Sequence, residues 1–278
     1  MSALEFSFIV FAVSAVAGFL GSLTGLGGGV VVTPVLTLML GVDLHYAMGA
    51  TLVSVIATSS GAAAAYVKEG FSNVRVGMFL EIATTVGAVA GAHLTRVVPV
   101  SALAVIFGLV LAYSAWVSWR PPKDADGSTP DPLATRLKLD GTYPGPAGPI
   151  RYRVSRVKEG LSMMFGAGLL SGLLGIGSGA VKVIAMDQFM RIPFKVSTAT
   201  SNFMIGVTAA ASAGVYLSRG YIQPALAMPV MLGVLGGSLV GARQLMGART
   251  RVLRAVFAAV VGLLALEMIY NGLSGGLR

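Results

Sequence analysis

The sequence contains no cysteine and few charged side chains. The lack of cysteine excludes disulfide bonds, thiolate metal sites and chemistry through a protein thiol. Charged residues make up only 11% of the chain and hydrophobic residues 55%, whereas a soluble domain carries about 25% charged residues. Because apolar runs reach membrane-spanning length, we predict an all-α polytopic membrane protein.

Motifs typical of enzymes are also missing. The only histidines are His45 and His93, and the chain has no His-Glu-x-x-His and no Gly-x-Ser-x-Gly motif. We therefore expect a protein that is not an enzyme, with no cofactor and no metal site.

The chain repeats itself with an offset of 150 residues. The segment Gly18–Val31 (GFLGSLTGLGGGVV) recurs as Gly168–Val181 (GLLSGLLGIGSGAV). From Ala17 to Val31 the ungapped shift gives eight identities in fifteen positions, and matches in the same register continue as far as Phe107 and Phe257. Such a register indicates a duplication, with a glycine-rich break inside apolar sequence in each half.

Each half contains five apolar segments. They are Leu4–Leu23, Val30–Leu40, Tyr46–Val67, Val74–Leu94 and Val100–Trp119, then Leu161–Leu174, Ala180–Met190, Val196–Leu217, Ile222–Ala242 and Val252–Asn271. The last three of each half are long enough to span, which takes about 20 residues. The second of each half has eleven residues and cannot cross as a continuous helix. Paired short segments of this kind point to the binding site of a transporter. Since Met1–Leu23 lacks a basic region and leads into the repeat itself, we keep it as structure rather than as a cleaved signal.

Residues 120–160 differ in composition from both halves. They hold seven of the twelve prolines, eight of the twenty Lys and Arg residues, and no apolar run. We therefore divide the chain into a first transmembrane repeat (1–119), a proline-rich linker (120–160) and a second transmembrane repeat (161–278).

Basic residues predict the orientation in the membrane. If the linker is cytoplasmic and each half crosses an odd number of times, the cytoplasmic side holds Lys68, Arg75, eight linker residues and five from loops of the second half, fifteen in all. The other side holds only Arg96, Arg219 and Arg278. The positive-inside rule therefore favours inverted repeats in the inner membrane, with a cytoplasmic linker and both termini outside. The net charge of +9 is explained in the same way and needs no nucleic acid.

Each half then crosses the membrane an odd number of times, and its last three segments each cross once. The first two segments must therefore either both span the membrane or together form a hairpin that enters and leaves on the same side. We favour half-depth hairpins whose glycine turns meet near the membrane midplane. A helix that starts at such a turn presents free N–H groups and its positive dipole end, which suit an anion. The predicted substrate-binding residues of the turns are Gly25, Gly27, Gly28 and Gly29 in the first half and Gly175, Gly177, Ser178 and Gly179 in the second. The alternative is that these glycines only allow close helix packing.

Small polar residues on the helix after each hairpin form a second set of candidates. Hydroxyl and amide groups are neutral donors to sulfite-like or carboxylate oxygens. The candidates are Thr51 in the first half and Thr200, Ser201 and Asn202 in the second. Interhelical hydrogen bonding is the alternative role of each.

Two ionisable residues inside apolar segments are candidates for function. Lys182 lies three residues after Gly179, where a cation opposes the helix dipole unless an anion is present, so we assign it to the substrate site. The alternatives are pairing with Asp187 or snorkelling to an interface. Glu81 is a candidate for proton coupling, since burial favours the protonated carboxyl. Its alternative is a packed, protonated or arginine-paired side chain.

The turns Gly25–Gly29 and Gly175–Gly179, the pairs Ala50-Thr51 and Thr200-Ser201, and the duplicated layout resemble the TauE/SafE-type sulfite exporter family. The resemblance covers both halves but not the linker. It implies transport of a small sulfur-containing or organic anion, such as sulfite, a sulfonate or sulfoacetate, coupled to an ion gradient. The second turn departs from the triple glycine and is followed by Lys182, which leaves the substrate open.

These observations predict a secondary transporter that works by alternating access around a site between the two turns. A passive anion channel built on the same hairpins is the alternative. The expected partners are a small anionic substrate and the lipid bilayer, with a coupling ion and an oligomer left open and no nucleic acid.

Overall fold

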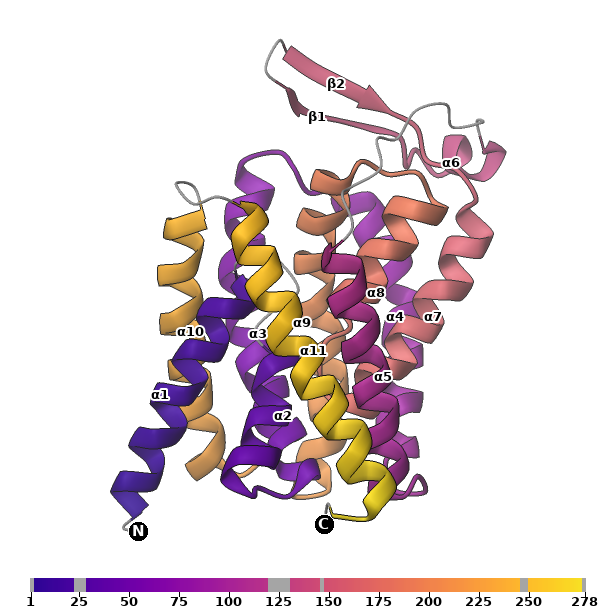
Figure 1. Cartoon of the computed structure of the whole chain (residues 1–278). Helices are drawn as coiled ribbons and strands as arrows, with labels where there is room; N and C mark the ends of the chain where they lie inside the picture. The colour runs from indigo at the N-terminus through magenta and orange to yellow at the C-terminus, as the bar shows by residue number, and fades with distance from the viewer. Residues whose placement is uncertain (1–2, 23–28, 120–130, 146–147, 246–249, 277–278) are drawn as a thin grey trace.

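A bundle of helices makes up nearly all of the computed structural model, which describes residues 3–22, 29–119, 131–145, 148–245 and 250–276 (Figure 1). The first half contains α1 (Ala3–Ser22), α2 (Gly29–Leu40), α3 (Leu44–Lys68), α4 (Val74–Leu94) and α5 (Val100–Trp119). The second half contains α7 (Val157–Leu174), α8 (Gly179–Ile184), α9 (Phe194–Ser218), α10 (Pro224–Leu245) and α11 (Thr250–Ser274). Each apolar segment predicted from the sequence therefore lies largely within a helix.

Two helices differ from the prediction. The segment Ala180–Met190 is not uniform, because α8 continues into a π-helical stretch, η1 (Ala185–Phe189). The helix α7 begins at Val157, inside the range assigned to the linker. The first N–H of α7 is capped by a residue far away in the sequence: the backbone N of Val157 donates to Oδ2 of Asp131 at 2.9 Å. A cap 26 residues away leaves no local signal in the sequence.

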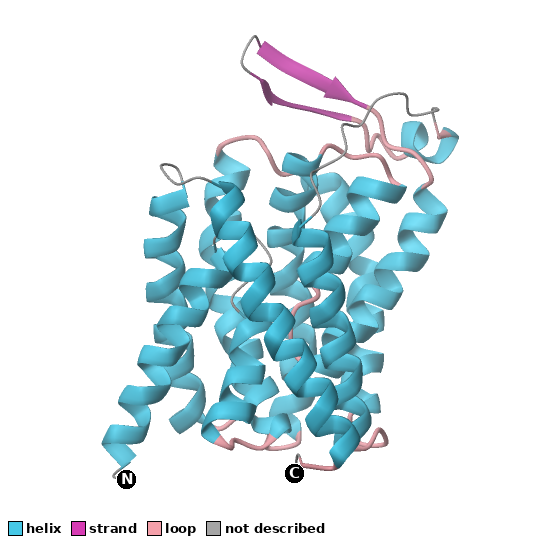
Figure 2. Cartoon of the chain, viewed as in Figure 1, coloured by secondary structure: helices cyan, strands magenta, loops and turns pink. Residues whose placement is uncertain are grey.

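The prediction of an all-α chain is wrong for the linker. There the structure has a short helix, α6 (Pro132–Arg136), and an antiparallel hairpin of β1 (Gly141–Gly145) and β2 (Gly148–Tyr152), drawn in magenta in Figure 2. Asp131 caps α6 by accepting from the N–H of Leu133 at 2.8 Å. The strands are only five residues each and contain glycine and proline, so their sequence does not stand out as β.

Asn73, just before α4, holds the linker against the bundle. Its Nδ2 donates to the carbonyl oxygen of Leu139 at 2.8 Å and to the phenolic oxygen of Tyr152 at 2.7 Å. Its Oδ1 accepts from the N–H of Val76 at 3.1 Å and so caps α4. Val76, Leu139 and Tyr152 are also buried together in one apolar cluster, so the linker and the helices share a core.

The ends of the chain and the linker lie at opposite ends of the bundle. Figure 1 shows the N and C labels at one end and β1, β2 and α6 at the other. Among the described helices, α4 is by length and composition the one long and apolar enough to cross a membrane. Shorter apolar stretches lie in α1, α2, α5, α10 and α11.

The main helix contacts follow a regular scheme. The helix α1 packs mainly on α10, α4 on α7, α5 on α11, and α3 on α9. By the offset of 150, α1 corresponds to α7 and α4 to α10, so the contact of α1 with α10 is the counterpart of the contact of α7 with α4. Glycines allow the helices to approach closely in both contacts: Gly87 lies against the backbone of Phe165, and Gly237 lies against the backbone of Ala15.

Candidate functional site

The turn between α7 and α8 lies inside the protein. Figure 2 shows it as a short loop segment at mid-height of the bundle, and residues 175–179 are all buried. Three of its residues are left-handed: Gly175 at φ 67°, Gly177 at φ 73° and Ser178 at φ 44°. Glycine adopts this conformation without the steric cost that a Cβ adds, which explains the Gly-x-Gly pattern.

The first turn lies mostly outside the described residues, since Gly25, Gly27 and Gly28 fall in the range 23–28. Gly29 is described and is the first residue of α2. The carbonyl oxygen of Ile176 is 3.8 Å from where a Cβ on Gly29 would lie, and side chains of Thr51 and Val55 are closer still. The start of α2 is therefore next to the second turn.

The predicted polar residues make hydrogen bonds around these turns. Thr51 accepts from the hydroxyl of Thr33 at 2.8 Å, and Ser201 donates to the carbonyl oxygen of Gly179 at 3.2 Å. Both Thr51 and Ser201 are fully buried. These two bonds join different helices, as the alternative reading of the hydroxyls expected. Ser201 also ties α9 to the first residue of α8.

Thr200 and Asn202 lie toward the linker end of α9 and bond differently. The hydroxyl of Thr200 accepts from the backbone N of Asn73 at 3.0 Å. The amide of Asn202 donates to the carbonyl oxygen of Thr198 at 3.1 Å, within its own helix. Thr200 therefore belongs to the junction between α9 and the loop before α4 rather than to the turn.

Ser178 is the polar residue of the turn whose bonding is incomplete. It is 2% exposed, and its hydroxyl has no hydrogen-bond partner among the residues that the structure describes. Buried hydroxyls are usually paired, so an unpaired one calls for an explanation.

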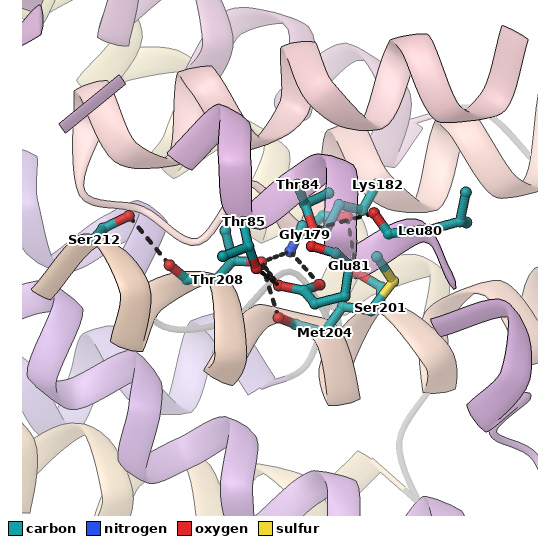
Figure 3. A network of polar contacts seen from close by, with 10 residues as sticks. All are labelled: Leu80, Glu81, Thr84, Thr85, Gly179, Lys182, Ser201, Met204, Thr208 and Ser212. Atoms are coloured by element: carbon teal, nitrogen blue, oxygen red, sulfur yellow. Dashed lines mark hydrogen bonds and ion pairs between the residues drawn. The ribbon is translucent and has the colours of Figure 1, made fainter. Parts of the chain in front are cut away.

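The second ionisable candidate, Glu81, turns out to be the partner of the first. Lys182 is fully buried, and its Nζ lies 3.8 Å from Oε2 of Glu81. Nζ also donates to the hydroxyl of Thr208, which donates to Oε1 of Glu81 at 2.5 Å. Figure 3 shows the ammonium of Lys182 between Thr208 and Glu81, which come from α9 and α4. The pairing of Lys182 with Asp187 that the sequence allowed is therefore wrong, and so is pairing of Glu81 with an arginine.

Sequence reasoning missed three hydroxyls of this region. Thr33 bonds Thr51, Thr208 bridges Lys182 and Glu81, and Thr85 donates to Oε1 of Glu81 at 3.2 Å. A helical period gives a weak signal for Thr85, which lies four residues after Glu81 on the same face. Nothing local marks the other two, because their partners are on other helices.

The whole bundle matches one family model. Residues 10–268 match the model described as "Sulfite exporter TauE/SafE". This chain belongs to the TauE/SafE sulfite exporter family. The predicted resemblance is thereby confirmed, and so is the expectation of a membrane transporter rather than an enzyme.

Curated relatives agree with this assignment over nearly their full length. The chain is 27% identical over 277 residues to the "Probable membrane transporter protein YunE" of Bacillus subtilis (strain 168), covering 96% of this chain and 99% of the relative. It is 26% identical over 236 residues to YdhB of the same organism, with 84% and 87% covered. It is 26% identical over 266 residues to ORF9 of Sinorhizobium sp, with 94% and 91% covered. No solved structure matches the chain.

Proposed function

We propose that this family member is a secondary transporter that moves a small sulfur-containing or organic anion, of the sulfite, sulfonate or sulfoacetate type, across the cytoplasmic membrane by alternating access. The observation that carries the proposal is the fully buried Lys182 beside the turn of Ser178, whose hydroxyl has no hydrogen-bond partner among the residues that the structure describes. A charge inside a membrane protein is costly and marks a substrate or ion pathway. An ammonium and a free hydroxyl are together suited to the oxygens of an anion.

The proposed architecture is a pair of inverted repeats, residues 1–119 and 161–278, whose first two helices form re-entrant hairpins. Two observations support it. The contact of α1 with α10 has its counterpart in the contact of α7 with α4, as a two-fold relation requires. The turn after α7 lies at mid-height and next to the start of α2, as hairpins entering from opposite sides would arrange it.

The proposed substrate site lies where the two turns meet. Its residues are Gly29, Thr51, Gly175, Gly177, Ser178, Gly179, Lys182, Thr200, Ser201 and Asn202, together with Gly25, Gly27 and Gly28 outside the described ranges. Thr200 and Asn202 flank Ser201 but do not bond to the turn: Thr200 bonds Asn73, and Asn202 bonds within α9. We therefore assign these two residues to the side of the site that faces the linker.

A surface pocket supports access from the linker side. It has a volume of about 280 Å³ and is lined by residues of the loop before α4 and the first turns of α9, including Lys195 and Thr198. Asn202 donates to the carbonyl oxygen of Thr198, so the pocket begins one helical turn from the proposed site. The pocket is also lined by the carboxylate of Glu69, and Lys195 is the cationic group in it that an anion would approach.

Uptake into proteoliposomes tests the proposal. The purified chain should give saturable uptake of at least one of sulfite, sulfoacetate and methanesulfonate, driven by the gradient of that anion. In Lys182→Met the affinity for that anion should fall about ten- to a hundred-fold, as expected for one lost charge-assisted contact. The matched control Lys195→Met should change the uptake rate at low anion concentration with a smaller effect on affinity.

Two results would contradict the proposal. The wild-type chain taking up none of the three anions would remove the assigned substrate class. Open-pore currents in a planar bilayer, far above transporter turnover, would instead favour the passive channel.

A further inference from the structure

The ion pair of Lys182 and Glu81 breaks the internal duplication. Shifted by 150 residues, Lys182 corresponds to Val32 and Glu81 to Met231. Apolar side chains therefore occupy the equivalent places in the other half, where the corresponding helices α2 and α10 both pack against α3. A bundle of this design does not need a buried charge pair at this position in order to fold.

The hydroxyl between the two charges differs in the same way. Thr208 corresponds to Thr58, whose hydroxyl bonds only within its own helix, to the carbonyl oxygens of Ser54 at 3.1 Å and Val55 at 3.2 Å. The hydroxyl of Thr208 also lies 3.0 Å from a carbonyl oxygen of its own helix, that of Met204. In addition, it joins Lys182 to Glu81. The three residues form one unit that a single half of the protein carries.

The two carboxylate oxygens of Glu81 have unequal surroundings. Oε1 accepts from the hydroxyls of Thr208 at 2.5 Å and Thr85 at 3.2 Å. Oε2 is buried with no hydrogen-bond partner among the described residues, and it faces the ammonium of Lys182 at 3.8 Å. Oε2 is thus free to take a proton while Oε1 keeps both of its donors.

Within the described residues, the other charged and titratable groups on the elements around Glu81 form no hydrogen bond or ion pair with it. On α4 they are Arg75 and His93, on α7 Lys158 and Glu159, on η1 Asp187, and on α9 Lys195 and Tyr216. The hydroxyl of Tyr216 donates to the carbonyl oxygen of Gly172. Within the described part of the chain, the ion pair recorded for Glu81 is the one with Lys182. The charge state of Glu81 therefore depends on where that ammonium is.

We propose that anion binding and proton uptake are coupled through competition for Lys182. The inference rests on the proposed function, in which an anion at the second turn becomes the counter-ion of Lys182. Glu81 is then a buried carboxylate without a counter-ion, which is strongly unfavourable. A proton from the aqueous side open at that moment adds to Oε2 and converts the carboxylate to a neutral carboxylic acid, while Thr208 and Thr85 continue to bond Oε1.

The cycle moves one anion together with one proton. When the anion leaves on the opposite side, Lys182 returns to Glu81 and the proton is released there. Each state of the interior then holds a cation with one anionic partner, so no step leaves an unpaired charge buried. A purely structural ion pair would show no such exchange.

Calorimetry of anion binding tests the coupling directly. Binding of methanesulfonate and of sulfoacetate, whose charges stay constant between about pH 6 and 8, is measured in two buffers that differ in ionisation enthalpy. The wild-type chain should take up about one proton per anion, with a Kd that rises about tenfold per pH unit. Glu81→Gln should take up no proton, and its Kd should not change with pH.

Further variants keep the test independent of folding. In Glu81→Gln, Lys182 has no competitor, so anion affinity at the upper pH should exceed that of the wild type. The double variant Glu81→Gln/Lys182→Met carries neither buried charge and should fold, with an anion affinity about ten- to a hundred-fold below that of Glu81→Gln. The control Glu267→Gln alters an exposed carboxyl on α11 and should keep the wild-type proton uptake.

The outcomes separate the two levels of inference. Failure of the wild-type chain to bind either anion contradicts the proposed function. Binding without proton uptake overturns the coupling alone. Unchanged proton uptake in Glu81→Gln would assign the proton to another group and overturn the role of Glu81.

Discussion

Gly18 of α1 packs directly against Val234 of α10, so that a Cβ on Gly18 would overlap the carbonyl oxygen of Val234. The offset of 150 turns this pair into Gly168 and Thr84, and a Cβ on Gly168 would overlap the carbonyl oxygen of Thr84 in the same way. Inside a membrane, helices associate through close packing of small residues rather than through hydrophobic burial. These two contacts therefore hold each half of the chain to the other.

Gly168→Ala should destabilise the protein by about 1–3 kcal/mol, because the added methyl meets backbone that cannot rotate away. The matched control is Gly166→Ala on the same helix, where nothing lies within 4 Å of the added Cβ. The measurement is the thermal unfolding of both variants in detergent. Equal unfolding temperatures would show that α7 and α4 do not depend on this contact.

Gly177→Ala should abolish transport or weaken anion binding more than tenfold. At φ 73° an alanine costs about 1–2 kcal/mol, and its Cβ would lie 2.8 Å from Cγ2 of Ile205 and 3.1 Å from Cγ1 of Val55. Gly220→Ala shares the backbone cost at φ 75° but meets nothing within 4 Å. The two variants should therefore differ in anion uptake. Similar uptake would show that the close approach of Gly177 to Ile205 and Val55 does not matter for transport.

The sequence was sufficient for the long helices of the bundle and for the place of the second glycine turn. Long apolar runs and the repeat at an offset of 150 residues are both features of the residue order, so they can be recognised without knowing the fold. Glycines of the second turn could be predicted because Gly175 and Gly177 need a left-handed backbone, a property of one residue.

Partners across the bundle could not be predicted in this way. Lys182 lies five residues from Asp187 in the sequence, yet it pairs with Glu81 on another helix. Which side chains meet depends on how α4, α8 and α9 are rotated against each other, and that is set by packing of the whole bundle. The linker hairpin could not be predicted for a related reason, since Asn73, which forms hydrogen bonds with it, lies outside the linker.

Asn73→Ala should loosen the linker, at a cost of about 1–3 kcal/mol, because it removes the bonds to Leu139 and Tyr152 and the cap of α4. Asn73→Asp keeps an oxygen for the cap but loses both donated bonds, so it separates the two roles. Tryptic cleavage at the exposed Arg151 should speed up in both variants, and thermal stability should fall most in Asn73→Ala. Cleavage at the wild-type rate would show that other contacts hold the hairpin.

Alkaline pH should release the same hairpin through Tyr152. Burial raises the pKa of this phenol, although the hydrogen bond from Asn73 lowers it. Because the folded pKa lies above the unfolded value of about 10, the stabilisation is complete below about pH 10 and is lost as the pH rises through the folded pKa. Cleavage at Arg151 should therefore increase above about pH 10. Tyr152→Phe should lack this step, and a step that persists in the variant would assign it to another group.

The topology is the last prediction: the linker is cytoplasmic and both termini are outside. The reason is the distribution of basic residues, fifteen on the linker side and three on the other, which membrane insertion follows. Single cysteines can be introduced without background because the chain has none. Thr142→Cys lies in the exposed part of β1, and Ser101→Cys is exposed at the start of α5, near the other end of the bundle. A membrane-impermeant maleimide added to intact cells should label Ser101→Cys, and it should label Thr142→Cys only after the membrane is permeabilised. The reverse pattern would invert the orientation, and labelling of both sites in intact cells would contradict the crossing of the membrane by α5, which lies between them.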